Sequence, residues 1–185
     1  MNSTSPKKMR VFISSLGKNP LEIALADAII FHMIQLDDFD RAILRILQKD
    51  NRTPQQKIGN AVNLSAPSVQ RRIRRMEAKG VIRTNTAVVD PALVDLALTI
   101  FVEVELVSET PTEIDAAKLA FRDAPEVQQC FYVTGEIDFM LVVVVQCMSA
   151  YEDFTRRMFF ANENIKKFRT YVAMDAIKTG STLNI

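Results

Sequence analysis

The chain has 185 residues, of which 48% are hydrophobic and 24% charged, as in an ordinary folded protein with one large or two small domains. No apolar run reaches the roughly 18 residues of a membrane-spanning helix, which excludes a membrane protein. The net charge of +1 hides an asymmetry: residues 36–90 carry eleven basic and six acidic side chains, whereas residues 91–185 carry eight and fourteen. This charge distribution predicts that the basic residues 36–90 form a binding half and that the acidic residues 91–185 form a half with a different function.

The two cysteines indicate the redox compartment of the protein. Cys130 and Cys147 both lie in apolar runs typical of strands. We expect both to be reduced and buried, as in a cytoplasmic protein.

Residues 1–35 are predicted to be an N-terminal extension outside both domains. Basic residues precede the apolar run 11–13, which is too short for a signal peptide. Two interpretations remain open: the segment is an amphipathic or basic arm of the native protein, or it is not native and Met33 is the biological start. The only histidine, His32, lies here, so no histidine-based catalytic or metal site is expected elsewhere.

Two helices are predicted at the start of the basic half. The first runs from about 39 to 49, with Asp37 as its N-cap and Asp40 placed favourably for the helix dipole. The second follows the run 53–56 (Thr-Pro-Gln-Gln), which is typical of a capping box with proline at the first helical position. It ends at Asn63, a residue that tolerates the left-handed conformation of a tight turn.

The next helix is the most informative element of the sequence. Ser65 is a suitable N-cap and Gly80 a suitable stop, and apolar residues spaced i, i+4 and i+7 form one stripe between them. From 65 to 83 there are six basic side chains and one acidic one. Such a face is either a solvated helix surface or a surface that binds nucleic acid, and the near absence of acids favours nucleic acid.

Two short helices joined by a tight turn are typical of a helix-turn-helix, whose second helix enters the major groove of DNA. The predicted DNA-binding domain covers residues 36–83. We expect base contacts near the N-terminal end of the second helix and phosphate contacts along the rest of it. The predicted base-reading residues are Ser65, Ser68, Gln70 and Arg71, and the predicted phosphate-binding residues are Arg72, Arg74, Arg75, Lys79 and Arg83.

The segment after this helix is predicted to be extended. Residues 81–89 alternate in polarity and are followed by a breaking Asp-Pro pair, which indicates a strand. A strand at this place is typical of a winged helix-turn-helix, and Arg83 could reach a phosphate from it. Residues 84–95 are predicted to serve as a hinge strand and linker.

Residues 96–185 are predicted to form a second domain. Its elements follow the order β-α-β-β-α-β, which is that of a ferredoxin-like sandwich, so the fold class of the whole chain is α+β. One face of this sheet is left without helices, and Tyr132, Val142 and Val144 are candidates for it, which predicts dimerisation through the sheet. The predicted strands are 98–106, 127–133, 139–145 and 168–174, and the predicted helices are 112–121 and 149–160, the latter opened by a capping box at 149–152.

Several motifs occur together in an order and at a spacing far more specific than a lone helix-turn-helix. They are LDxxDxxILxxLQ (36–48), LS (64–65), RRIxRME (71–77), GVI (80–82), VTGEID (133–138) and RTYVxM (169–174). On these residues the chain resembles the Lrp/AsnC (feast/famine, leucine-responsive) family of transcription regulators over about 36–185.

The resemblance implies a winged helix-turn-helix followed by a ferredoxin-like module that dimerises and binds an amino acid, with dimers commonly assembling into octamers. In this family the effector lies at subunit contacts beside a Gly-acid-x-Asp turn. The effector-binding residues implied for this chain are Val133, Thr134, Gly135, Glu136, Ile137 and Asp138, with Thr170 on the last strand.

The same turn also has a simpler interpretation, as a tight hairpin connection in which glycine and acids are common. A ligand role is chemically reasonable because Asp138 or Glu136 could pair with an ammonium group. Gly135 permits the close approach of backbone N–H donors to a carboxylate. Apolar neighbours of the turn favour an apolar effector such as leucine or methionine.

The leading hypothesis is therefore a cytoplasmic, sequence-specific DNA-binding transcription regulator that responds to an amino acid and forms homo-oligomers on double-stranded DNA. The alternative is an architectural DNA-wrapping protein without a ligand response. No catalytic constellation is present, so we expect no enzyme activity, no metal and no cofactor. Two residues depart from the family pattern: Asn63 replaces the usual glycine, and Gln70 stands where an apolar residue is common, which bears on base preference.

Overall fold

The structure is a computed structural model that describes residues 35–180 and 182–185. The extension predicted at 1–35, with its candidate start at Met33, lies outside the described residues except for Gln35.

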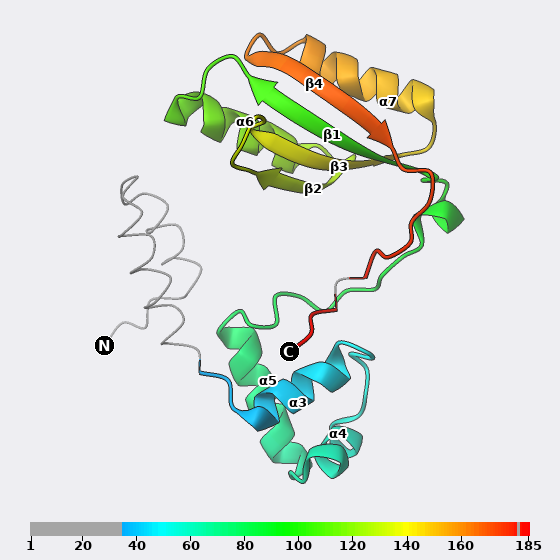
Figure 1. Ribbon diagram of the computed structural model, residues 1–185. Coiled ribbons are helices and arrows are strands. Elements are labelled where there is room, and N and C mark those ends of the chain that lie inside the picture. The colour runs from blue at the N-terminus through cyan, green and yellow to red at the C-terminus, as the bar shows by residue number, and fades with distance from the viewer. Residues whose placement is uncertain (1–34, 181) are drawn as a thin grey trace. The chain divides into compact units, whose positions relative to one another are not determined.

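The chain divides into two compact units (Figure 1). The first unit ends at Ala87 and also takes Gly180–Ile185, and the second spans Val88–Thr179. The predicted second domain, 96–185, therefore differs from the structure at its end, because the last residues of the chain pack with the first unit.

The first unit contains three helices that meet in one apolar core. The predicted helices are present as α3 (Asp38–Leu47), α4 (Gln55–Val62) and α5 (Ala66–Ala78). The helices α4 and α5 pack as a helix-turn-helix, with α3 against both. The buried apolar side chains of this core are Ile43, Leu44, Ile58, Val62, Val69 and Met76.

Several helix ends follow the predicted local signals. Asp37 caps α3 in a two-way capping box with Asp40. Asn63, at the end of α4, has φ 56° and ψ 42°, so the left-handed turn is confirmed. The Ser65 hydroxyl caps α5 by accepting the backbone N–H of Ser68 at 3.4 Å.

Two predicted capping boxes are wrong. α4 begins after Pro54, and the Thr53 hydroxyl donates instead to the carbonyl oxygen of Asp50 at 2.8 Å, so it closes the preceding turn. The box predicted at 149–152 is also absent, because α7 (Met148–Thr155) begins earlier, with Cys147 at its N-cap position.

The predicted wing strand at 81–89 is wrong as well. In the described chain, no residue between α5 and Leu98 belongs to a strand, and the one regular element there is the 3₁₀ turn η1 (Pro91–Val94). Val81 and Ile82 pack on the helical core, whereas residues 83–95 are exposed. An alternating segment becomes a strand only if a neighbouring strand accepts its hydrogen bonds, and the described residues of this chain offer none to it.

The second unit is a four-stranded antiparallel sheet with the strand order β2-β3-β1-β4. The element order βαββαβ confirms the predicted ferredoxin-like fold (Figure 1). The strands are β1 (Leu98–Leu106), β2 (Val127–Tyr132), β3 (Phe139–Val145) and β4 (Ile165–Val172); the helices are α6 (Pro111–Asp123) and α7, which continues into the π turn η2 (Arg156–Phe160).

Both helices of this unit cover one face of the sheet. Phe121 of α6, Phe154 of α7 and Phe159 of η2 are buried against alternate residues of β1 and β3. The Phe121 ring meets Phe139 edge to face at 5.3 Å. The opposite face of the sheet is left without helices.

The uncovered face differs in composition from the prediction. Its centre is Phe101, which lies opposite Val142 on one side and Tyr171 on the other. Phe101 and Tyr171 are 42% and 48% exposed, whereas Val144 is buried. Tyr132 is exposed but belongs to the helix-covered side, because it pairs in register with the core residue Phe139. The prediction is thus corrected for Tyr132, whereas Val144 lies opposite Thr99 on the uncovered face although its side chain is buried.

The two thiols differ in their surroundings. Both cysteines are free, Cys130 half-buried and Cys147 exposed, so the prediction of burial is wrong for Cys147. Burial raises the pKa of the Cys130 thiol. Hydrogen bonds from the Ser149 hydroxyl and the Ala150 backbone N–H lower the pKa of Cys147.

Candidate DNA interface and effector site

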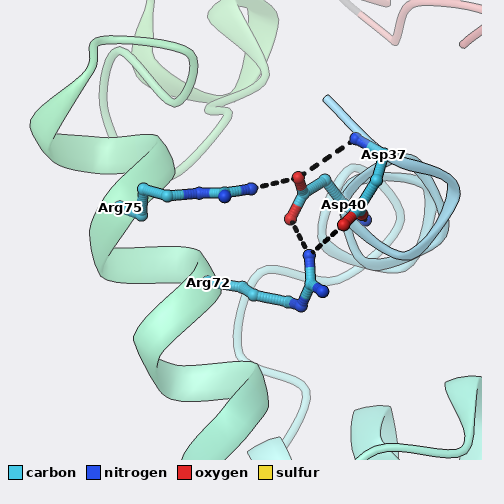
Figure 2. Close-up of polar contacts among 4 residues, drawn as sticks. All are labelled: Asp37, Asp40, Arg72 and Arg75. Atoms are coloured by element: carbon cyan, nitrogen blue, oxygen red, sulfur yellow. Dashed lines mark hydrogen bonds and ion pairs between the residues drawn. The ribbon is translucent and has the colours of Figure 1, made fainter. Parts of the chain in front are cut away.

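A buried carboxylate ties the recognition helix α5 to the start of α3 (Figure 2). The Asp40 side chain is fully buried, and its Oδ1 accepts Nη1 of Arg72 at 2.9 Å while its Oδ2 accepts Nη2 of Arg75. Arg72 Nη1 also lies 2.6 Å from Asp37 Oδ2. The Arg72 guanidinium stands 5.4 Å from the centre of the Phe39 ring. The cluster joins residues of two helices into one charged network.

The capping box organises the acidic side of this network. The Asp40 backbone N–H donates to Asp37 Oδ1 at 2.8 Å, and the Asp37 backbone N–H donates back to Asp40 Oδ2 at 3.3 Å. The first of these bonds, together with Arg72, lowers the pKa of Asp37. The same carboxylates raise the pKa of Arg72. Both carboxylates thus face the guanidinium group of Arg72.

This network divides the arginines of α5 into two pairs. Arg72 and Arg75, both predicted as phosphate contacts, are paired with Asp40 inside the first unit. Arg71 and Arg74 are exposed and form no ion pair within the described part of the chain. Because residues 71 and 74 are three apart on a helix, their side chains share one outward face.

The N-terminal end of α5 lies next to a tight turn. Ser65 donates its hydroxyl to the Ser68 hydroxyl at 3.0 Å. Gln70 is half-buried, and Arg83 is exposed beyond the end of the helix. A Cβ placed on Gly59 would lie 2.4 Å from the carbonyl oxygen of Leu64, so α4 and the turn can approach this closely only at a glycine.

Sequence reasoning missed the role of Asp40, although the sequence contains a signal for it. Asp40 precedes Ile43 and Leu44 by three and four residues, so it lies on the same apolar stripe of α3. An acid on a buried stripe needs a cationic partner. The two arginines three residues apart on α5 supply it.

The predicted effector turn is held against β1 by its own aspartate. Gly135, with φ of +128°, allows the turn between β2 and β3. The Val133 backbone N–H donates to the Asp138 carbonyl at 2.9 Å. The Asp138 carboxylate is buried, and its Oδ2 accepts the Leu106 backbone N–H at 2.7 Å. Asp138 therefore has a structural task, which leaves the exposed Glu136 as the freer anion of the turn.

An open cleft of about 210 Å³ lies beside this turn. Within its wall Arg169 Nη1 lies 3.2 Å from Glu103 Oε2, which also accepts the Tyr171 hydroxyl at 3.2 Å. The residues that line it are Glu103, Glu105, Glu136, Ile137, Lys167, Phe168 and Arg169.

The structure does not bring Thr170 to this cleft. Thr170 lies opposite Val102, which is a core residue, so it points to the helix-covered side of the sheet. Its hydroxyl lies 2.6 Å from that of Tyr151 in α7. Of the predicted effector residues, Glu136 and Ile137 line the cleft, with Thr134 and Gly135 exposed beside them in the chain.

Comparisons with known proteins match both units. An AsnC-type helix-turn-helix domain matches residues 36–77, and an Lrp/AsnC ligand-binding domain matches residues 99–183. The leucine-responsive regulatory protein of Escherichia coli K12 is 34% identical over 150 residues, which are 81% of this chain and 92% of that protein. The chain belongs to the Lrp/AsnC family of transcriptional regulators.

Other relatives match a similar share of this chain. An uncharacterised HTH-type regulator of Sinorhizobium fredii, y4tD, is 39% identical over 80% of this chain and 87% of its own. The structure of an AsnC family regulator from Agrobacterium tumefaciens superposes with a TM-score of 0.76 at 34% identity, covering 80% of this chain and 97% of that one. The regulator NMB0573 of Neisseria meningitidis, solved with L-methionine, gives a TM-score of 0.75 at 27% identity, covering 81% and 97%.

Membership in the Lrp/AsnC family makes this chain a DNA-binding transcription regulator with a ligand-binding domain, and not an enzyme. α5 is the recognition helix of its helix-turn-helix. Among the residues that the structure describes, no group of three or more potential metal ligands is assembled, and no helix could cross a membrane.

Proposed function

We propose that this Lrp/AsnC regulator reads DNA through one outward face of α5, whose central residues are Arg71 and Arg74. The observation that carries the proposal is the division of the arginines: Arg72 and Arg75 form ion pairs with Asp40, whereas Arg71 and Arg74 are exposed and form no ion pair within the described residues. Guanidinium groups suit guanine edges and phosphates. In this proposal Ser65, Ser68, Gln70 and Arg71 read bases, and Arg74, Lys79 and Arg83 hold phosphates.

The DNA half is tested by salt-dependent binding. Duplexes are first selected from a random pool with the wild-type chain, and their affinity is then measured by fluorescence anisotropy over a range of salt concentrations. Arg74→Ala should lower the slope of log K against log salt by about 0.9, as expected for one lost phosphate contact. Arg71→Ala should also relax sequence preference, by about 1–3 kcal/mol per misread base pair.

Arg52→Ala is the matched control, because Arg52 is a highly exposed arginine outside α5 whose ion pair with Asp50 is long, at 3.9 Å. It should leave slope and preference unchanged. A wild-type slope near zero, or equal slopes for Arg74→Ala and Arg52→Ala, would contradict the proposed face.

We further propose that the cleft beside 133–138 receives a free amino acid. In this proposal Glu136, which lines the cleft, pairs with the ammonium group, and the backbone at the neighbouring Gly135 pairs with the carboxylate. Ile137 and Phe168 supply the apolar part of the lining. An apolar amino acid such as methionine or leucine is favoured, since one relative was solved with L-methionine and others are leucine-responsive regulators.

The regulator is further proposed to act in the cytoplasm as a dimer formed through the uncovered sheet face, with dimers assembling into octamers. Phe101 and Tyr171 supply the apolar centre of that face, and the effector shifts the equilibrium between assemblies that present the recognition helices at different spacings.

A thermal-shift screen against the twenty amino acids at millimolar concentration tests the effector. A bound amino acid stabilises only the state that binds it, so one compound should raise Tm by several degrees. Glu136→Gln should abolish this shift, whereas Glu109→Gln, at an exposed acid of the same unit, should keep it. Twenty flat traces would favour the alternative function, an architectural DNA-wrapping protein without a ligand response.

A further inference from the structure

The last residues of the chain pack on the DNA-binding unit and not on the sheet that precedes them. Gly180–Ile185 belong to the first unit by their contacts. The Ile185 side chain packs against the helical core of that unit. Arg45, on the C-terminal half of α3, donates its Nε–H to the backbone oxygen of Ile185. None of these contacts is part of the DNA-reading face of α5 or of the effector cleft.

Gln48, at the end of α3, fixes the register of this tail. Its Nε2 donates to the Leu183 carbonyl oxygen at 3.1 Å, and its Oε1 accepts the Leu183 backbone N–H at 2.6 Å. This is the two-way pairing that a neighbouring strand gives to a backbone residue in an antiparallel ladder. Because the Leu183 side chain is 69% exposed, recognition at this point is of the backbone.

The tail follows β4, a strand that carries proposed functional surfaces, after the intervening residues 173–179. β4 ends at Val172; its Lys167 and Arg169 line the effector cleft, and its Tyr171 lies on the uncovered sheet face. The chain leaves the DNA-binding unit after Ala87 and returns to it at Gly180. A docked tail therefore gives that unit a second connection to the sheet domain, besides the exposed linker.

We propose that Leu183–Ile185 form a latch that docks on the C-terminal half of α3 and restrains the DNA-binding unit. A unit attached by one irregular linker reorients freely, whereas a second attachment removes much of that freedom. Docking and undocking of the latch thus set the orientational freedom of the recognition helix. Effector binding at the cleft or dimerisation at the sheet face would act on the latch through β4, and this coupling rests on the proposed function. The docking of the latch does not rest on it.

Hydrogen exchange of the full chain, followed by mass spectrometry and NMR, tests the docking. In the wild-type chain the Leu183 amide should exchange at least about tenfold more slowly than an unstructured amide, since it is held by Gln48. Gln48→Ala should remove this protection. Lys49→Ala, at the neighbouring exposed residue of α3, should retain it. An unprotected Leu183 amide in the wild type, or equal protection in both variants, would overturn the latch.

A second variant separates loss of the latch from damage to α3. Leu183→Pro lacks the backbone N–H that Gln48 accepts and leaves every residue of the helices unchanged. ¹⁵N relaxation should then show faster independent tumbling of the α3–α5 amides, with the amides of the sheet unchanged. Identical relaxation in wild type and Leu183→Pro would refute the restraint. Neither measurement requires DNA or an amino acid. Failure of the latch proposal is therefore distinguishable from failure of the proposed function.

Discussion

Asp40 decides how two arginines of the recognition helix are used. A fully buried carboxylate is costly unless cationic partners compensate its loss of hydration, and here Arg72 and Arg75 do so from successive turns of α5. The pairing also joins α3 to α5. A sequence pattern that predicts DNA contacts thus includes side chains with a structural task.

Removal of the Asp40 charge should destabilise the first unit. Asp40→Asn leaves two guanidinium groups without their buried partner, but both arginines are partly exposed and can recover water. We therefore expect a loss of about 2–4 kcal/mol in the free energy of unfolding, near the lower end of the range for broken buried ion pairs. Urea denaturation at neutral pH, followed by a signal of the helical unit, measures it.

Asp38→Asn is the control for this experiment, because Asp38 lies in the same first turn but is exposed. Its effect should stay within about 0.5 kcal/mol, as is usual for surface substitutions. If the two variants unfold at the same urea concentration, Asp40 does not have the role assigned to it.

Among the elements, the turn between α4 and α5 is fixed by a close approach at Gly59. Glycine inside a helix usually costs about 1 kcal/mol relative to alanine, so Gly59→Ala would stabilise an ordinary helix. Here the new Cβ would lie 2.4 Å from the Leu64 carbonyl oxygen, a backbone atom that cannot swing aside. We expect a net destabilisation of about 1–3 kcal/mol from overpacking. Thermal unfolding measures it, with Lys57→Ala on the exposed side of α4 as the neutral control.

Most helix ends with local causes could be predicted, although the capping boxes at 53–56 and 149–152 are wrong, whereas the wing, with a distant cause, could not. The caps at Asp37 and Ser65 and the left-handed Asn63 depend on neighbouring residues, and all three are present. The alternation of apolar and polar residues in β1 predicted which face of the strand is buried, because a sheet covered on one side produces that alternation. The wing at 81–89 required a partner strand, which no local pattern can supply.

The candidate site was only partly predictable for the same reason. Arg71 and Arg72 are adjacent and chemically identical, and only the fold of α3 against α5 distinguishes a surface arginine from one held by Asp40. Likewise the aspartate of the effector turn was predicted as a ligand, whereas its carboxylate accepts the backbone N–H of Leu106, a residue 32 positions away. Glu136 and Ile137 do line the cleft beside that turn.

For the whole molecule, the proposed assembly depends on the uncovered sheet face. Phe101 and Tyr171 lie opposite each other in register and are about half exposed. Phe101→Glu should weaken the proposed dimer at least about thirtyfold, as for an aromatic residue near the centre of an interface. Sedimentation equilibrium measures the dissociation constant. Leu119→Glu, at an exposed leucine of α6 in the helical layer, is the matched control and should leave it unchanged. A monomeric wild-type chain, or equal effects of both variants, would contradict assembly through this face.

The alternation of anchored and exposed arginines along α5 has an evolutionary consequence. Positions 71 and 74 face outward without internal partners in the described chain, so they can accept new side chains with little effect on folding. Positions 72 and 75 are constrained by Asp40, because replacement of either arginine removes one of the two cationic partners of a buried charge. A duplicated gene could therefore acquire a new operator preference by drift at the first pair, while the second pair preserves the scaffold that presents it.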